Sequence, residues 1–373
     1  MRILVLNYEY PPLGGGASPV SRDISVQLHK MGHDVTVVTM GYKDLPACEM
    51  QQGVKIYRLK CWRSKKSSCM PWEQYTYLLS VRRFMKKHMQ NHDYDVCHVH
   101  FVIPTGEAAG WIKKKYKIPY IITAHGSDVE GHNKKLYMRV MHRFLRPSWR
   151  KIAKNSERMI APSTYLQTLM KRECREGNYS YIPNGLNVEK YRDLIRGKEK
   201  EKRILLMGRM QKFKNIQTVL NAMAKVDMEG WKVDILGDGP YRERLEKLSV
   251  ELGLADCVKF YGWIDNNSKE QLEFLQKAAI YITASWYENC PMAVLETIAA
   301  GCYPLLSDIP AHRQIVSDEE FYFQKDDVQG LAEKMKRVMK KFPYLTNRID
   351  VEKYDWNNVM IQYEQVLKEA RRK

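Results

Sequence analysis

The chain has 373 residues, enough for two domains of ordinary size. Hydrophobic residues make up 44% of it and charged residues 28%, a balance that excludes a disordered or collagen-like protein. Because no apolar stretch approaches the roughly 18 residues that span a bilayer, no transmembrane helix is expected. Residues 1–7 are typical of a strand rather than a signal peptide. The eight cysteines form no CxxC pair, which favours a reducing cytosol over a disulfide scaffold or a zinc site.

Positive charge is concentrated in the first half of the chain. The net charge is +18, of which residues 1–183 contribute +16 and residues 184–373 contribute +2. This asymmetry indicates an anionic partner: a nucleic acid, a membrane surface or a phosphorylated substrate. Three basic segments, 60–66, 82–87 and 134–158 with Trp149, suit a membrane surface or single-stranded nucleic acid, with an ordinary solvated face as the alternative. The aromatic residues interleaved with the first two are Trp62, Trp72, Tyr75 and Tyr77.

Short apolar runs alternate with amphipathic stretches along the first half. The expected strands are 2–6, 35–39, 54–59, 96–99, 120–123 and 159–161. The expected helices are 19–31, 72–89, 105–115 and 165–175. Parallel strands joined by helical crossovers predict a doubly wound α/β sheet.

The same pattern restarts in the second half, after a polar segment, 188–202, that is expected to be a linker. The expected strands are 203–207, 232–236, 257–260, 280–283 and 303–306. The expected helices are 215–226, 241–252, 268–277 and 291–300, with a final helix at about 356–371. Two similar α/β halves predict a cleft between two domains, which is a favoured place for ligands.

Two strand ends in the first half carry candidate binding residues. Gly14–Gly16 lie between the first strand and the first helix, where backbone amides and the helix N-terminus suit an anion, although a flexible turn has the same composition. The run is not GxGxxG, and Thr39 stands where NAD binding would require an acid, so NAD is not expected. His125 follows a predicted strand at the end that faces ligands in open α/β sheets, where it can bond to a substrate hydroxyl.

Two loops in the second half carry charged candidates. Arg209 ends the first strand of this half and Lys214 follows closely, so the two cations could clamp a diphosphate or simply form a solvated basic loop. Glu288 ends a later loop, and Pro291 takes the first position of the next helix, whose first amides would offer an anion site. Glu296 lies further along that helix. Two carboxylates at one helix mouth can hold sugar or ribose hydroxyls, with a pair of surface acids as the alternative.

Three further patterns look chemical but are interpreted as structural. Asp93 and Asp95 spell the D-x-D motif of metal-dependent nucleotide binding, yet they fall in a turn before a strand, where Asp is common. His98 and His100 share one strand face but have no third ligand nearby. Cys290 is expected to be a small packing residue rather than a reactive thiol at a helix start. No metal site is therefore expected.

Together, in this order and spacing, these residues resemble the retaining glycosyltransferases of family 4, which have the two-domain GT-B fold. The resemblance covers nearly the whole chain. The matching segments are Gly14–Gly16, His125–Asp128, Ile182–Gly185, Gly208-Arg209 with Lys214, Gly237–Pro240, Tyr261–Trp263, and Glu288 and Glu296 with Ala299–Gly301. The chain departs from the family pattern in Asn215, where glycine is usual, and in Ser307–Gln314, where a Gly-Gly turn ending in Glu is usual.

The resemblance implies two Rossmann-like domains facing each other across a cleft. Residues 1–184 would bind the acceptor and residues 185–354 the nucleotide-sugar donor, with a last helix, 355–373, crossing back to the first domain. The implied catalytic residues are His125, Arg209, Lys214 and Glu288. The implied acceptor contacts are Gly14 and Asp128. The implied donor contacts are Gly15, Gly16, Arg209, Lys214, Gly237, Trp263, Asn289, Cys290, Pro291, Met292, Ala293 and Glu296.

The implied reaction moves a sugar, with retention, from a nucleotide-diphosphate sugar to a lipid-linked or glycan acceptor in cell-surface polysaccharide or glycolipid synthesis. A UDP-sugar is favoured over a GDP-sugar. Cationic side chains and helix-start amides would stabilise the leaving diphosphate, so no metal or other cofactor is expected. A cytoplasmic enzyme, peripheral at the inner face of an anionic membrane, would explain the basic first half. An NDP-sugar epimerase and a nucleic-acid-binding protein stay as alternatives, although no nucleic-acid partner is expected.

Overall fold

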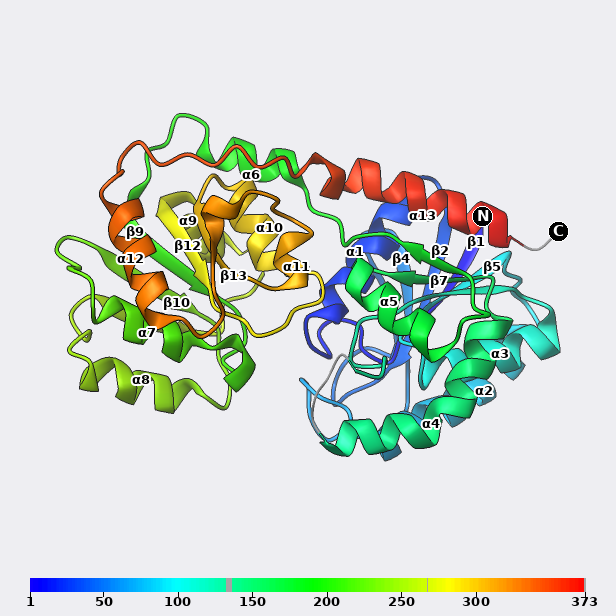
Figure 1. Ribbon diagram of the computed structural model, residues 1–373. Coiled ribbons are helices and arrows are strands. Elements are labelled where there is room, and N and C mark those ends of the chain that lie inside the picture. The colour runs from blue at the N-terminus through cyan, green and yellow to red at the C-terminus, as the bar shows by residue number, and fades with distance from the viewer. Residues whose placement is uncertain (132–135, 267, 372–373) are drawn as a thin grey trace. The chain divides into compact units, whose positions relative to one another are not determined.

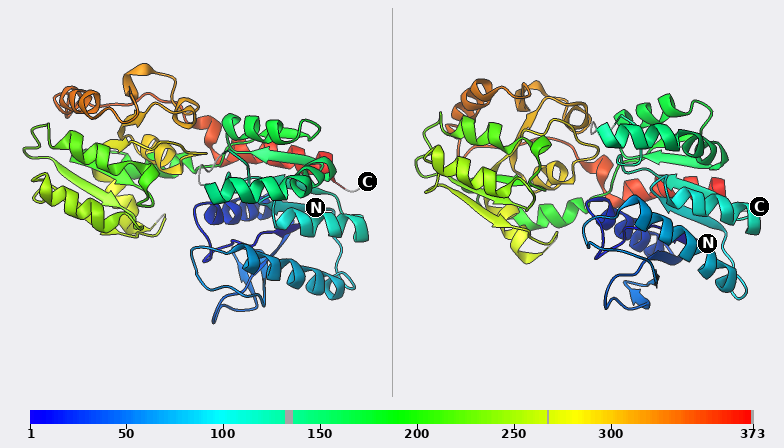
Figure 2. Two further views of the ribbon diagram at one scale, coloured as in Figure 1. Left: turned by 60° about the horizontal axis from the view of Figure 1, so that its bottom comes forward. Right: turned by 90° about the horizontal axis from the view of Figure 1, so that it is seen from below.

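The computed structural model describes residues 1–131, 136–266 and 268–371. The chain divides into two compact units, one formed by Met1–Gly185 with Trp356–Lys373 and the other by Leu186–Asp355 (Figure 1). Each unit contains a largely parallel β-sheet of its own, with helices on both sides of it (Figure 2). The predicted fold class, two doubly wound α/β halves, is confirmed.

Over the described residues, the first unit has an eight-stranded sheet in the order β3-β4-β2-β1-β5-β6-β7-β8, in which only β3 and β4 pair antiparallel. Its strands are β1 (Arg2–Leu6), β2 (Asp34–Met40), β3 (Cys48–Gln51), β4 (Val54–Leu59), β5 (Val96–His100), β6 (Tyr120–Thr123), β7 (Arg158–Ala161) and β8 (Tyr179–Tyr181). Its helices are α1 (Ala17–Lys30), α2 (Pro71–His88), α3 (Thr105–Tyr116), α4 (Leu136–Asn155), α5 (Thr164–Glu173) and α13 (Trp356–Ala370).

The first sheet is buried on both faces, as β1 illustrates. Ile3 and Val5 belong to the core that includes side chains of α1 and α13, whereas Leu4 and Leu6 belong to the core that includes α2 and α3. Successive side chains of a strand point to opposite faces, so an unbroken apolar run is what a doubly covered parallel strand requires. This is why the sequence pattern located the central strands of this sheet, although not β3 or β8.

Helix α13 completes the first unit, although the whole second unit separates it from the rest in the sequence. Val359, Tyr363 and Leu367 are buried at helical spacing against the core that also contains α1. The ring of Trp356 packs on Gly185, where an added Cβ would lie only 2.1 Å from it. The predicted return of the last helix to the first domain is therefore present.

In the described residues, the second unit has a six-stranded parallel sheet in the order β11-β10-β9-β12-β13-β14. Its strands are β9 (Glu201–Met207), β10 (Lys232–Leu236), β11 (Val258–Gly262), β12 (Ala278–Thr283), β13 (Tyr303–Ser307) and β14 (Tyr322–Phe323). Its α-helices are α6 (Val188–Ile195), α7 (Ile216–Met223), α8 (Arg242–Glu251), α9 (Lys269–Lys277), α10 (Met292–Ala299), α11 (Pro310–Arg313) and α12 (Val328–Met339). None of the helices in the described ranges is long and apolar enough to cross a bilayer.

The segment expected to be a linker is structured instead. Helix α6 occupies Val188–Ile195, and β9 already begins at Glu201. Asn187 caps the helix by accepting a hydrogen bond from the Lys190 amide at 3.0 Å, and Val188 and Tyr191 are buried in the core of the second unit. Two fully buried positions in eight residues are too few to give a visible helical period, which is why the sequence pattern missed the helix.

Candidate active site

Each sheet has a point where the strand order reverses: between β1 and β5 in the first unit, and between β9 and β12 in the second. In open α/β sheets, ligands bind outside the carboxyl ends of the strands at such a point. The predicted site residues lie on loops that leave these ends. Gly14–Gly16 follow β1, Arg209 and Lys214 follow β9, and Glu288 follows β12.

In the glycine loop of the first unit, Gly14 packs closely against a neighbouring side chain, whereas Gly15 and Gly16 have free space around them. Gly14 has φ +98°, and an added Cβ would lie 2.7 Å from the side chain of Glu9, so this position requires glycine. A Cβ on Gly15 or Gly16 would meet nothing within 4 Å. The Gly15 amide lies 3.4 Å from Glu9 Oε2. A carboxylate this close opposes the binding of a phosphate at the loop and suits a ligand with hydroxyl groups.

His125 lies just beyond β6 and is held by a second histidine. Its Nε2 is 3.0 Å from Nδ1 of His100, which is buried at the end of β5, and the two rings are stacked. Burial lowers the pKa of His125 to about 3 and that of His100 well below its usual value, so both rings are neutral near pH 7. One nitrogen of the pair must therefore donate and the other accept.

Asp128 holds the loop that carries His125. One carboxylate oxygen accepts hydrogen bonds from the amides of His125 and Gly126, at 3.1 and 3.0 Å, and the other accepts from the Val102 amide at 2.7 Å. Burial raises the pKa of Asp128, and these three bonds oppose that shift. The contacts describe a residue that positions His125, and binding of the acceptor by Asp128 stays a prediction.

Two of the three patterns interpreted as structural, the D-x-D pair and His98, make structural contacts. Asp95 Oδ2 accepts from the Arg2 amide at 2.7 Å, and Asp93 forms an ion pair with Arg2 at the amino end of β5, far from the strand ends that carry the site. His98 Nε2 is 2.9 Å from Thr123 Oγ1 inside the core. Within residues 1–131, 136–266 and 268–371, no three His, Cys, Asp or Glu side chains group closely enough to hold a metal ion.

In the second unit, glycines let three strand ends approach one another. The Gly208 amide donates to Leu236 O at 3.0 Å, and the Gly237 amide donates to Gly262 O at 2.7 Å. An added Cβ on Gly237, where φ is +130°, would lie 2.1 Å from Gly208 O. Gly237 is thus needed for close backbone packing beneath the site, whether or not it also touches a donor.

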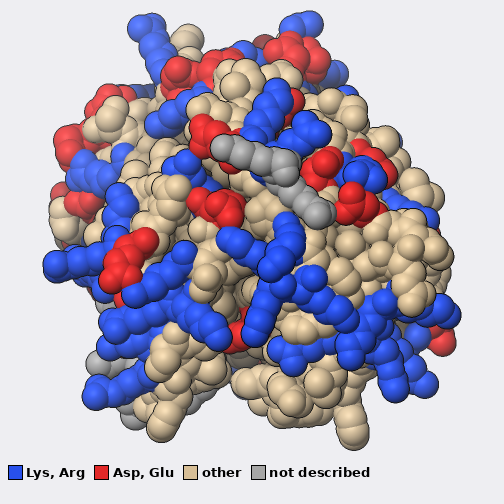
Figure 3. All heavy atoms as spheres, turned by 90° about the vertical axis from the view of Figure 1, so that its right-hand side faces the viewer, with Lys and Arg blue, Asp and Glu red and all other residues tan. Residues whose placement is uncertain are grey.

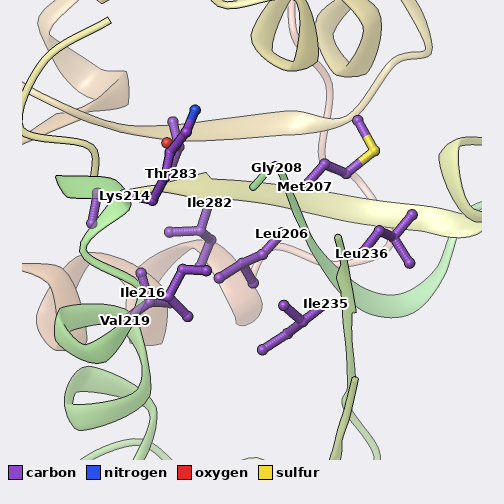
Figure 4. A pocket seen from close by; sticks show the side chains of 11 residues that line it. Leu206, Met207, Gly208, Lys214, Ile216, Val219, Ile235, Leu236, Ile282 and Thr283 are labelled. Carbon is purple, nitrogen blue, oxygen red and sulfur yellow. The ribbon is translucent and has the colours of Figure 1, made fainter. Parts of the chain in front are cut away.

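A pocket opens at the carboxyl ends of β9, β10 and β12 (Figure 4). Its floor is apolar, and its polar groups come from Lys214 and Thr283 at the rim. The apolar side chains that line it are Leu206, Met207, Ile216, Val219, Ile235, Leu236 and Ile282. The pocket therefore lies at the reversal point of the second sheet and includes the predicted diphosphate-binding lysine.

Lys214 and Glu288 form an ion pair at this edge of the sheet. Lys214 Nζ is 2.5 Å from Glu288 Oε1, which also accepts a hydrogen bond from Ser285 Oγ at 2.7 Å. The Glu288 side chain is only 13% exposed. Burial raises its pKa, but Lys214, Ser285 and His312 together lower it more, so the pKa of Glu288 lies below its usual value. Glu288 is consequently an ionised acceptor at neutral pH.

Further groups that could bind an anion lie close in sequence to Lys214 and Glu288: the guanidinium of Arg209 and the first amides of α10. Arg209 is exposed and forms no ion pair with any residue that the structure describes. Helix α10 begins at Met292, so Pro291 is its N-cap rather than its first residue, a shift of one position from the prediction. The Val294 amide donates to Pro291 O at 3.0 Å, whereas the two amides before it, of Met292 and Ala293, have no carbonyl within the helix to donate to. The first turn of α10 contains no acidic residue. This terminus can accept an anion.

The remaining predicted donor contacts surround these groups in different ways. Glu296 is buried on α10, one turn beyond its first residues. Asn289, Cys290 and Ala293 are half-buried beside the start of that helix. Trp263 follows β11 with 65% of its surface exposed, and its indole Nε1 donates to Asp265 Oδ1 at 3.0 Å. An exposed indole held in this way can stack on a nucleotide base.

Two residues that support Glu288 were not found from the sequence. Ser285 donates directly to its carboxylate, and its position three residues before Glu288 was the available signal. His312 is fully buried, with Nδ1 2.8 Å from Ser307 O, and burial lowers its pKa although the negative charge of Glu288 opposes that shift. His312 lies in Ser307–Gln314, the stretch that departs from the family pattern, so this departure adds a group next to the site.

Comparison with known families assigns both units. Residues 14–190 match the model of glycosyltransferase family 4, and residues 187–351 match that of glycosyl transferases group 1. The chain is a glycosyltransferase of family 4. The two matches meet where the two units meet in the sequence, at residues 185 and 186.

This glycosyltransferase has relatives that match along most of its length. An uncharacterized glycosyltransferase of Methanocaldococcus jannaschii is 26% identical, with 99% of this chain and 98% of the relative covered. Alpha-monoglucosyldiacylglycerol synthase of Streptococcus pneumoniae is also 26% identical, with 88% and 77% covered. The structure of HepE from Anabaena in complex with UDP superimposes with a TM-score of 0.73 at 15% identity, with 99% and 100% covered. The fold is GT-B, as predicted.

Proposed function

We propose that this glycosyltransferase transfers a sugar from a UDP-sugar, with retention of configuration, to a lipid-linked or glycan acceptor in glycolipid or cell-surface polysaccharide synthesis. The unit Leu186–Asp355 would bind the donor and the other unit the acceptor. The HepE complex with UDP supports the choice of nucleotide, and the S. pneumoniae relative, named as a glycolipid synthase, supports the choice of acceptor.

The observation that carries the proposal is the set of groups at the carboxyl ends of β9 and β12. Lys214, Arg209 and the first amides of α10 are suited to a diphosphate, and the ionised Glu288 is suited to sugar hydroxyls. For His125 we propose a bond from its neutral ring to a sugar hydroxyl.

In the proposed reaction the bond from the sugar's anomeric carbon to the diphosphate breaks, and a bond from that carbon to the acceptor oxygen forms on the same face. The departing diphosphate takes the proton of the acceptor hydroxyl. Arg209, Lys214 and the α10 amides would stabilise the negative charge that develops on the diphosphate, which is the work a metal ion does in other transferases. We therefore propose a metal-independent reaction.

The test is a screen of UDP- and GDP-sugars for thermal stabilisation of the enzyme, followed by product analysis with lipid-linked and glycan acceptors. We expect UDP-sugars to stabilise and the anomeric NMR signal of the product to show retention. Inversion, or turnover with GDP-sugars alone, would refute the corresponding part of the proposal. Conversion of the donor sugar without any acceptor would instead identify an epimerase.

We further propose that the enzyme is cytoplasmic and docks on the inner, anionic face of the cell membrane through a surface built on α2. Trp72, Tyr75 and Leu79 follow one another at helical spacing, and each is about half exposed. The rings of Trp62 and Trp72 meet edge to face, with centroids 5.4 Å apart. The α2 surface consists of Trp62, Trp72, Tyr75, Leu79, Arg82, Arg83, Lys86 and Lys87.

Aromatic and basic residues in this order suit the headgroup region and the anionic surface of a bilayer. Lysine and arginine are dense on the side of the first unit drawn in Figure 3. Two residues of the basic and aromatic pattern identified in the sequence, Tyr77 and Arg63, do not belong to this surface. Tyr77 is buried, with its hydroxyl donating to Val38 O at 2.8 Å, and the Arg63 side chain is fully buried among backbone carbonyls. Burial of these two makes the docking surface narrower than the sequence indicated.

A further inference from the structure

We propose that Asp326 is a positioning residue of the donor site. It fixes the two loops that carry Lys214 and Glu288 relative to each other, and it acts through Asn215 and Trp286. The inference deepens the proposed function and rests on it, because it assumes that Lys214 binds the donor diphosphate. All the residues involved belong to the second unit.

The two loops contact each other along their length. The Trp286 amide donates to Phe213 O at 2.8 Å, and the rings of Phe213 and Tyr287 are stacked with centroids 4.6 Å apart. Directly beyond this stack lies the ion pair of Lys214 with Glu288. The position of the ion pair therefore depends on how the two loops are held together.

Asp326 joins the same two loops from a third segment, the connection between β14 and α12. Its Oδ1 accepts a hydrogen bond from the indole of Trp286 at 2.7 Å and another from the side-chain amide of Asn215 at 2.9 Å. One oxygen that receives a bond from each loop sets the spacing of Asn215 and Trp286. Asn215 directly follows Lys214 in the sequence, and Trp286 lies two positions before Glu288.

Asn215 is shaped to pass on this constraint. Its backbone is left-handed, with φ +55°, and its side chain is buried at 1% exposure. Its Oδ1 accepts bonds from Gln217 Nε2 at 2.7 Å and Thr218 Oγ1 at 3.0 Å, which fixes the amide so that Nδ2 faces Asp326. The glycine usual here would take the same backbone conformation but would offer none of these bonds. Asn215, which stands where the family usually has glycine, and Asp326 thus act together to hold the loop.

The experiment measures the affinity of the full-length enzyme for free UDP by calorimetry, together with the donor KM, kcat and thermal stability. Asp326→Ala should weaken UDP binding on the order of tenfold, because the loop that carries Lys214 is no longer preorganised. Asp326→Asn keeps an oxygen able to accept both bonds and should rescue most of the affinity. The matched control is Asp327→Ala, which removes the N-cap of α12 and should lower thermal stability without changing UDP affinity.

Two further variants keep the inference testable if Asp326→Ala fails to fold. Trp286→Phe removes the indole donor and Asn215→Gly removes the amide donor, and each should weaken UDP binding. Wild-type UDP affinity in Asp326→Ala, or equal loss in Asp327→Ala, would overturn the inference. Failure of the proposed function looks different: Lys214→Ala would then leave UDP affinity unchanged, whereas loss in Lys214→Ala without loss in the Asp326 variants refutes only the positioning role.

Discussion

Single charged residues determine how the donor site meets its ligand. Lys214 and Glu288 form an ion pair at 2.5 Å, so each of these largely buried charges has a partner of opposite sign. A bound diphosphate would form an ion pair with Lys214, while Glu288 would still accept its hydrogen bond from Ser285. If the donor binds here as proposed, the ion pair holds both groups in position beforehand.

Glu288→Ala should abolish most of the transfer activity while the fold survives, because Glu288 lies on a loop. Loss of a charge-assisted bond to the sugar predicts a fall in kcat/KM on the order of 100-fold. The measurement is steady-state kinetics with thermal unfolding of the same samples. Glu243→Ala, which removes an exposed carboxylate on α8, is the control and should behave as wild type. A folded Glu288→Ala enzyme with the wild-type rate would contradict the assignment.

Arg209→Ala and Lys214→Ala should each weaken the binding of free UDP, by about 1.5–3 kcal/mol for a charge-assisted contact. Calorimetry measures this without any need for an acceptor. Lys212→Ala is a matched control because Lys212 is exposed on the same short turn as Lys214. If both site variants bind UDP as tightly as the control, the cations do not form a diphosphate clamp.

The depressed pKa of Glu288 predicts a pH dependence of stability. Its pKa in the folded protein lies below the ordinary value of 4.5, so ionised Glu288 stabilises the fold above that pH. The contribution is lost as the pH falls through the lower, folded value. The difference in thermal stability between wild type and Glu288→Gln should therefore be constant near neutrality and shrink in acid. A difference that instead grows with acidification would show that the carboxyl is protonated in the folded state.

Secondary structure was predictable where a periodic pattern was long enough to be seen. The buried strands β1, β6 and β10 matched the expected ranges residue for residue, since each is an apolar run enclosed by turn residues. The edge strands β3, β8 and β14 were missed, because they have only two to four residues each. Strand and helix periods carry no signal at such lengths.

For the candidate site, the sequence indicated which loops carry the candidate residues but not the contacts that hold those loops together. Cations and acids that follow strand ends pointed to Lys214 and Glu288, because parallel strands bring their carboxyl ends to one edge. Gly237 was implied by the family resemblance alone. The support of Asn215 by Asp326 joins residues 111 positions apart. A contact at that separation leaves no local pattern, so only the folded chain reveals it.

Gly237→Ala should destabilise the second unit, because the strand ends approach too closely for a side chain. The new Cβ would meet Gly208 O at 2.1 Å, and we expect a cost of about 1–3 kcal/mol in the free energy of unfolding. Gly253→Ala is the control: φ is +70° there, but an added Cβ meets nothing within 4 Å. Chemical denaturation of both variants separates backbone strain from the clash. Equal losses would mean that the clash relaxes without cost.

At the scale of the whole molecule, catalysis does not account for the charge. The excess lies in residues 1–183, whereas the proposed diphosphate site belongs to the second unit. The anionic membrane surface proposed for the first unit would explain the difference. Basic residues near such a surface contribute on the order of 1 kcal/mol each, and salt weakens them.

The enzyme should co-sediment with anionic liposomes, but not with neutral ones, and added salt should release it. Reversal of Arg82, Arg83, Lys86 and Lys87 to Glu should abolish this binding without changing UDP affinity. The end of helix α12 and the two residues after it offer a control in the second unit, because Lys336, Arg337, Lys340 and Lys341 have the same sequence spacing and are exposed. Equal binding to both kinds of liposome, or loss of binding in the control, would refute docking through the α2 surface.

The interrupted sequence of the first unit also sets an order of assembly on the ribosome. Residues 1–185 emerge first, but one face of their sheet lacks the Val359, Tyr363 and Leu367 side chains of α13. The second unit is continuous, and Leu186 and Asp355 bridge side by side at its two ends, so it can complete its core alone. At about 5–20 residues per second, the sheet of the first unit waits roughly ten to thirty seconds for its cover. The unit that is translated first is therefore the one whose core is completed last.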